Sequence, residues 1–210
     1  MESLTETLAR RAAERDVEAR QAAAVREMEL IVEATYRVIE RTGEVDPKLR
    51  DILREAKLST QAFYRHFRSK DELLLVLLDD GRARLVSYLE HRMAKARSRD
   101  GRVREWIAGV LAQASDPAAA ERTRPFMASQ DRIAEHFPAE QQASADRLVD
   151  LLAGALADGA DAGAQRRARR DAQAVYHLAF GTLHRHLTYR TVPAAAEVDH
   201  LVAFAIKGCS

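Results

Sequence analysis

The stretch that most constrains the fold is residues 49–78, LRDILREAKLSTQAFYRHFRSKDELLLVLL. A break at Lys57 separates two short helical patterns, and Ser59 is placed to cap the second of them. Phe63 and Phe67 lie four residues apart, so they can share the buried face of that second helix. Two short amphipathic helices joined by a tight turn are typical of a helix-turn-helix. The apolar face of the first helix has spacings of three and four: Leu49, Ile52, Leu53 and Ala56.

A longer helix is predicted directly after this pair. Ser69 and Glu72 stand three residues apart, as in a capping box, and six consecutive apolar residues follow at 73–78. The pattern continues to the mid-90s through Leu85 and Met93. On the other side, residues 21–42 keep helical spacing and end at Gly43, which can adopt the left-handed conformation of a helix cap.

The segments that precede and follow this first helix are considered separately. Asp46 is placed to cap a helix whose first position is Pro47. Residues 1–20 mix acids with arginines and contain few large apolar side chains, which fits either a mobile arm or a frayed helical extension. We favour a flexible N-terminal arm.

Composition supports an all-α protein with room for two domains. The chain has 210 residues, 47% of them hydrophobic, and only 5 Pro and 9 Gly. An amphipathic helix is predicted over 103–114, short helices between breaks at Pro125 and Pro138, and a further helix over 144–156. A loop over 157–164 is expected to precede two closing helices, roughly 165–190 and 194–206.

The charge distribution favours DNA as a partner. The net charge is only +1, but residues 41–70 hold eight Lys or Arg against four acids. Such a local surplus attracts phosphates, although basic stretches also coat ordinary solvated helices. Cys209 is the only cysteine, so no disulfide can form within one chain, and no apolar run is long enough for a membrane span or a signal peptide. A cytoplasmic location is expected.

Catalytic and metal sites are not expected. The sequence has no nucleophile beside a base, no phosphate-binding loop and no paired carboxylates in an apolar setting. His177 and His184 share a helix face, but they stand seven apart and no cysteine or acid completes a ligand set. We therefore predict no enzyme activity, no metal and no cofactor.

The motifs resemble those of the TetR family of transcriptional regulators. ELIVEATYRVIERTG is similar to the family's first helix with its closing glycine, and RDILREAKLSTQAFYRHFRSKDELL is similar to the second, third and fourth helices. The most recognisable positions are Phe63, Tyr64, Phe67, Lys70 and Leu73. The resemblance implies a three-helix DNA-binding head over 21–70 and a helical ligand-binding and dimerisation domain over 71–210.

The recognition helix is expected to show its outer face to DNA. Gln61 can bond an adenine edge in two places, and Tyr64 can give its hydroxyl to phosphate or sugar. The free amides at the helix start favour phosphate, and the family resemblance adds Lys70 as a phosphate contact. The predicted DNA-binding residues are Lys48, Ser59, Thr60, Gln61, Tyr64, Arg65 and Lys70.

Three positions depart from the family's pattern. Lys57 stands where the family usually has a glycine, Leu53 where it has a small residue, and Asp46-Pro47 where it has a hydroxyl. A non-glycine in the turn requires backbone strain or a shifted turn. A carboxylate at position 46 would repel phosphate.

The second domain is expected to pair two chains and to hold a small apolar or amphipathic effector, as the resemblance implies. The two closing helices carry apolar stripes that fit either a dimer interface or the core of one chain: Val175, Leu178, Ala179, Leu183, Leu187, Val198, Leu201, Val202 and Ala205. Large side chains that fit either a pocket wall or the core are Leu78, Tyr88, Trp106, Val110, Phe126, Met127, Phe137, Leu152, Tyr176 and Phe180.

Two functions remain open. The first is a homodimeric repressor that a small effector releases from a palindromic DNA operator. The second is a DNA-binding regulator without a small effector, either constitutive or controlled by a protein partner. A second domain filled by its own side chains would favour the latter.

Overall fold

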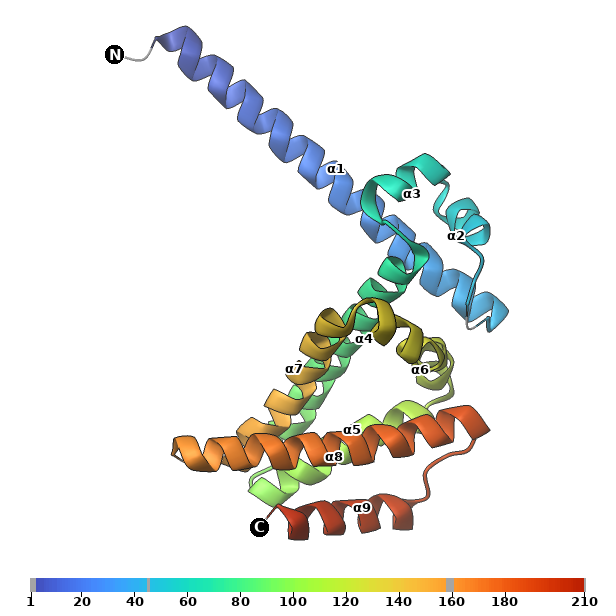
Figure 1. The fold of residues 1–210 in the computed structure, drawn as a ribbon, viewed down its shortest axis with the longest axis vertical. Coiled ribbons are helices and arrows are strands. Elements are labelled where there is room, and N and C mark those ends of the chain that lie inside the picture. Colours follow the sequence, from blue (N-terminus) through green and yellow to red (C-terminus); the bar gives the residue numbers. More distant parts are fainter. Residues whose placement is uncertain (1–2, 45, 158–160, 210) are drawn as a thin grey trace. The chain divides into compact units, whose positions relative to one another are not determined.

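The computed structural model describes residues 3–44, 46–157 and 161–209, and in these ranges the regular structure is entirely α-helical. The all-α expectation is therefore confirmed. Along the described chain the helices are α1 (Leu4–Thr42), α2 (Leu49–Ala56), α3 (Thr60–His66), α4 (Lys70–Met93), α5 (Arg99–Ser115), α6 (Pro117–His136), α7 (Pro138–Ala157), α8 (Ala162–Tyr189) and α9 (Ala195–Gly208) (Figure 1).

The chain divides into two compact units, residues 1–73 and 74–210. We call them unit 1 and unit 2. The helix α4 begins in unit 1 and continues as the first helix of unit 2. No helix of the described residues is long and apolar enough to cross a membrane.

In unit 1 the helices α1, α2 and α3 pack against one another. Their buried faces supply its core, with Phe63 and Ile52 fully inaccessible to solvent. Gly43 ends α1 with φ at 65°, the left-handed cap that the sequence predicts. The apolar face predicted for α2 is also confirmed, because Ile52, Leu53 and Ala56 are buried.

Two expectations for unit 1 differ from the structure. Helix α1 runs from Leu4, so residues 4–20 are a helical extension rather than an arm without regular structure. Because these residues have good helix propensity and contain no Pro or Gly, the helix can continue without a packed face. Asp46 does not cap α2: the helix starts at Leu49, its N-cap is Lys48 without a side-chain hydrogen bond, and Pro47 is buried ahead of it.

Unit 2 is organised around α5. Its residues Val103, Trp106, Ile107, Val110 and Leu111 are almost fully buried, and α5 contacts α6, α7, α8 and α9. The inward face predicted for 103–114 is thus confirmed. Ser98 caps α5 by accepting a hydrogen bond from the Gly101 amide.

Short helices broken at Pro125 were the wrong expectation for the next segment. The helix α6 is continuous from Pro117 to His136 and contains Pro125. Asp116 caps its start, accepting hydrogen bonds from the amides of Ala118 and Ala119. A proline inside a helix removes one backbone donor, and here the surrounding turns and tertiary packing keep the helix intact. Pro138 instead occupies the first position of α7, where a missing donor costs nothing.

Candidate functional site

The third helix of unit 1 is fixed by an aromatic pair on its inner side. Phe63 is completely buried and Phe67 is 1% exposed, and their rings stack with centroids 5.3 Å apart. The Ser59 hydroxyl accepts a hydrogen bond from the Ala62 amide at 3.1 Å, so the predicted cap is confirmed. This anchoring leaves the opposite side of a seven-residue helix open to solvent.

The exposed side of α3 carries mainly polar side chains. Thr60, Gln61 and Arg65 are exposed, and Tyr64 has 59% of its surface accessible. An exposed tyrosine of this degree in a packed helix contributes little to the core. Its ring meets Phe63 edge-on at 5.2 Å, which holds the hydroxyl away from the hydrophobic side.

The turn between α2 and α3 places a lysine in the left-handed region. Lys57 has φ 56° and ψ 38°, and it forms the C-cap of α2. The Leu58 amide donates to the Leu53 carbonyl at 3.0 Å, which closes the turn. The predicted strain is therefore present: the turn keeps its shape with a residue for which this conformation is unfavourable.

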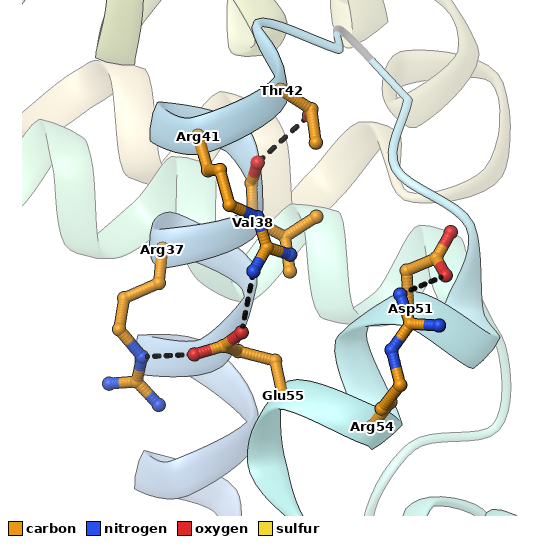
Figure 2. A network of polar contacts seen from close by, with 7 residues as sticks. All are labelled: Arg37, Val38, Arg41, Thr42, Asp51, Arg54 and Glu55. Atoms are coloured by element: carbon orange, nitrogen blue, oxygen red, sulfur yellow. Dashed lines mark hydrogen bonds and ion pairs between the residues drawn. The ribbon is translucent and has the colours of Figure 1, made fainter.

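A carboxylate of α2 ties that helix to α1. Glu55 Oε1 accepts a hydrogen bond from Arg37 Nε at 3.1 Å, and Glu55 Oε2 accepts one from Arg41 Nη1 at 3.1 Å (Figure 2). The hydrogen bond from Arg37 is the main reason that the pKa of Glu55 lies below its usual value. Glu55 therefore joins α2 to two successive turns of α1.

A second carboxylate connects α1 to α3. Glu27 Oε2 lies 3.0 Å from Arg65 Nη2 and 2.6 Å from His66 Nε2. The hydrogen bond with His66 is the largest cause of a lowered pKa at Glu27. This contact could not be predicted from the sequence, because the partners are 38 and 39 residues apart and no local pattern marks Glu27.

The lysine at the start of α4 also has an acidic partner. Lys70 Nζ lies 2.5 Å from Asp46 Oδ1, in the segment that leads into α2. The neighbouring Ser69 hydroxyl accepts a hydrogen bond from the Glu72 amide at 3.1 Å, as half of the predicted capping box. Glu72 does not complete the box at Ser69; its carboxylate accepts a hydrogen bond from the Arg68 amide instead.

Comparison with known families identifies this head. Residues 31–77 match the family model described as bacterial regulatory proteins of the tetR family, a range that includes α2, α3 and the start of α4. With this match, the head is identified as that of a TetR-family regulator. Proteins of this family are transcriptional regulators with a helix-turn-helix.

Solved structures share the fold of this chain over most of its length. NemR from Escherichia coli in its reduced form is 18% identical with a TM-score of 0.61, covering 87% of this chain and 97% of that one. The regulator FadR from Bacillus subtilis, in complex with stearoyl-CoA, is 17% identical with a TM-score of 0.55, covering 86% and 95%. A TetR transcription regulator from Haloarcula marismortui is 19% identical with a TM-score of 0.57, covering 87% and 96%. A comparison with curated proteins returned no match.

Unit 2 contains an open cleft of about 610 Å³ among α4, α6, α7 and α8. Its volume lies within the range of small-molecule sites, about 300–1,000 Å³. The lining is more polar than the sequence analysis expected: Arg82, Met127, Gln130, Asp131, Ala134, Pro138, Gln141, Gln142, Ala145, Val149, Gln173, Tyr176, His177, Phe180, Gly181 and His184.

Three of the predicted pocket residues line this cleft: Met127, Tyr176 and Phe180. The rings of Tyr176 and Phe180 stack with centroids 4.4 Å apart and form its aromatic wall. Tyr88 lies away from it, at a surface pocket with Arg92. Phe137 is the C-cap of α6 and is half-buried, and the side chain of Phe126 lies outside the described part of the structure.

The remaining predicted pocket residues take the alternative role of core. Leu78 is 5% exposed, and the other three are completely buried: Trp106, Val110 and Leu152. None of the four is among the residues that line the cleft. These four side chains face the packed interior instead.

The apolar stripes of α8 and α9 also turn mostly inward. Val175, Ala179, Leu183, Leu187, Val202 and Ala205 are buried within one chain, where both helices pack against α5. Leu178, Val198 and Leu201 are only half-buried. Large apolar surface is instead exposed at Phe204 (63%), Val192 (63%) and Tyr189 (73%).

Proposed function

We propose that this TetR-family protein is a homodimeric transcriptional repressor that leaves a palindromic operator when a small amphipathic effector binds in the cleft of unit 2. The observation that carries the proposal is the exposed polar face of α3 over the buried Phe63–Phe67 pair. A short helix held by one face and polar on the other is suited to the major groove. Repression is the commoner mode in the family.

The expected contacts divide into base-reading and phosphate contacts. Gln61 and Thr60 are proposed to read base edges, and Tyr64 and Lys48 to contact the backbone, together with the amide groups that follow Ser59. Arg65 and Lys70 are proposed contacts that must first leave acidic partners, Glu27 and Asp46. Their contribution to affinity is therefore smaller than that of an unpaired cation.

A second copy of the chain is proposed to pair through α8 and α9. A groove of about 390 Å³ runs between these helices, lined mainly by apolar residues that include Leu178 and Phe204. Exposed aromatic side chains beside an apolar groove are typical of protein interfaces. The symmetry of such a dimer explains how a head that reads only a few base pairs recognises a longer palindrome.

Effector control is proposed to act through α4. This helix carries Lys70 at its start in unit 1 and Arg82 in the wall of the cleft. A ligand that binds more tightly when α4 is in one position changes the fraction of dimers whose two heads both fit DNA. The cleft supports this version over a regulator without a small effector, because a second domain filled by its own side chains would leave no such volume.

The test is selection of bound duplexes from a random library, followed by fluorescence anisotropy of the winner at several salt concentrations. We expect a palindrome, a steep salt dependence, relaxed preference at one base pair for Gln61→Ala, and uniformly weaker binding for Tyr64→Ala. Gln165→Ala, an exposed glutamine of α8, is the matched control and should bind like the wild type. Failure to enrich any sequence contradicts the proposal.

A further inference from the structure

The cleft in unit 2 contains a buried cation whose described partners are all neutral. Arg82 is only 5% exposed, yet it lines the cleft. Its Nη1 donates to the backbone carbonyl of Gln141 at 3.0 Å, and its side chain interacts electrostatically with the hydroxyl of Tyr176. Among the residues that the structure describes, Arg82 forms no ion pair.

The carboxylate whose charge acts on Arg82 is already paired with another arginine. Asp79, whose charge acts on Arg82, is paired with Arg147. Burial is the main cause of a lowered pKa at Arg82, which reflects the poor solvation of its charge. A buried charge without a counter-ion is costly, and proteins rarely retain one without a partner.

A neutral polar atom beside Arg82 is also unsatisfied. Within the described part of the chain, the side-chain oxygen Oε1 of Gln141 is buried and accepts no hydrogen bond. Gln141 lines the same cleft, so an N–H or O–H donor that enters it can satisfy this acceptor. The stacked rings of Tyr176 and Phe180 add a flat apolar wall next to these groups.

The other acidic residues near the cleft do not pair with Arg82. Asp146 is held by Arg169 at 3.0 Å and by the Gln142 amide at 2.9 Å. Asp131 lines the cleft but is exposed to solvent, as are His177 and His184 on α8. Among the charged residues that line the cleft, Arg82 is therefore buried and Asp131 is exposed.

We propose that the cleft binds a small amphipathic anion whose carboxylate pairs with Arg82 while its aromatic or apolar body lies against Tyr176 and Phe180. This rests on the proposed function only in naming the bound molecule as the effector. It narrows the ligand class from amphipathic molecules in general to organic acids. An added N–H group would contact Gln141 Oε1.

The test is isothermal titration calorimetry of the full chain with matched probes. Indole-3-acetate carries the carboxylate, the ring and an N–H donor; indole-3-acetamide lacks the charge, and 1-naphthaleneacetate lacks the N–H. Hydrogen bonds to a charged group are roughly twice as strong as neutral ones, so we expect the acetate to bind at least about tenfold more tightly than the acetamide. 1-Naphthaleneacetate should fall between them.

Substitutions test whether Arg82 causes the preference for the acid over the amide. Arg82→Gln should reduce the acid-to-amide ratio to about one, whereas Arg84→Gln, an exposed arginine of the same helix paired with Asp80, should leave it unchanged. Tyr176→Phe keeps the charge of Arg82 and removes a neighbour that orients it, so it should lower the ratio part of the way. Arg82→Gln removes a hydrogen bond between α4 and α7, so the helicity of this variant is checked by circular dichroism. If Arg82→Gln does not fold, the acid-to-amide ratio of Tyr176→Phe is the test.

Equal binding of acid and amide to the wild type, or binding of neither, overturns the assignment, as does an Arg82→Gln variant that folds and keeps the preference. Operator binding separates this result from the proposed function. A chain that selects an operator but shows no acid preference retains the regulator role and loses the anion site. A chain that prefers the acid but selects no DNA sequence retains the site and loses the regulator role.

Discussion

Asp46 Oδ1 lies 2.5 Å from Lys70 Nζ, so the lysine that the family resemblance assigns to phosphate is held by a carboxylate in the absence of DNA. From its position in the sequence, Asp46 is expected to cap a helix and to repel phosphate. The structure gives it a different neighbour, and its effect on DNA binding follows from that neighbour. A phosphate that approaches Lys70 must compete with Asp46 for the same ammonium group.

Replacing Asp46 by asparagine should therefore strengthen DNA binding. Asp46→Asn removes the competing charge and keeps the size of the side chain, so Lys70 can bind phosphate without breaking an ion pair. We expect affinity to rise about two- to fivefold for all sequences alike, the range given by a surface ion pair. The slope of log affinity against log salt should steepen by about 0.9, the value for one further phosphate contact.

Anisotropy over a salt series measures this effect. Asp80→Asn is the matched control, because it removes an equal charge paired with Arg84 in unit 2. Its affinity and slope should stay at the wild-type values. Equal changes in both variants would mean that net charge, and not the freed Lys70, is responsible.

Replacing Lys57 by glycine should stabilise the protein. The left-handed conformation costs an ordinary residue about 1–2 kcal/mol, and the extra freedom of glycine in the unfolded chain cancels part of the gain. We expect the free energy of unfolding of unit 1 to rise by about 0.5–1 kcal/mol. Urea titration followed by circular dichroism measures it.

Two further positions calibrate that result. Arg190 has φ 54° at the end of α8, so Arg190→Gly should stabilise unit 2 by a similar amount. Lys48 has φ −70°, an ordinary conformation, so Lys48→Gly should give no gain. Stabilisation by Lys48→Gly as large as that by Lys57→Gly would show that backbone strain is not the cause.

Glu27 should give unit 1 a stability that depends on acid pH. Its pKa is held below the ordinary 4.5, mainly by the hydrogen bond with His66, so the charged form is favoured in the folded state. A lowered carboxyl pKa contributes stability above the unfolded value and loses it as the pH falls through the folded value. The destabilisation caused by Glu27→Gln should be full at pH 6 and should shrink as the pH falls below about 4.5.

Urea titrations at a series of pH values test this dependence. Glu33→Gln is the control on the same helix, since Glu33 is exposed and pairs with Arg37 only at 3.5 Å. We expect Glu33→Gln to change stability little at any pH. A Glu27→Gln effect of constant size from pH 6 to pH 3 would contradict the assigned role of the charge.

Replacing Phe204 by glutamate should dissociate the proposed dimer. Phe204 is 63% exposed in one chain, so the substitution leaves the core intact while placing a charge in the apolar groove between α8 and α9. We expect a monomer by light scattering, with weaker operator binding because the two heads are no longer linked. Val25→Glu, at an apolar side chain of α1 that is 53% exposed, should remain a dimer.

The head could be predicted from local sequence because its signals are local. The cap at Ser59, the buried Phe63 and Phe67, and the left-handed Gly43 each depend on residues a few positions away. The turn at Lys57 kept its shape without glycine because the packing of Leu53, Phe63 and their neighbours outweighs about 1–2 kcal/mol of strain. Local patterns specify local structure.

The sequence could not decide which apolar residues of unit 2 are buried, because burial depends on which face of each helix packs against another helix. Periodicity shows that Leu183 and Val202 belong to apolar stripes, but only the packing against α5 shows that the stripes are internal and that Phe204 is left outside. Likewise, only the tertiary structure shows that Trp106 lies in the core. It also shows that Arg82 lies in a cleft whose other walls come from helices about 45 to 100 positions further along the chain. Burial, and the partners of a buried charge, are properties of the assembled chain, because distant helices supply the surrounding atoms.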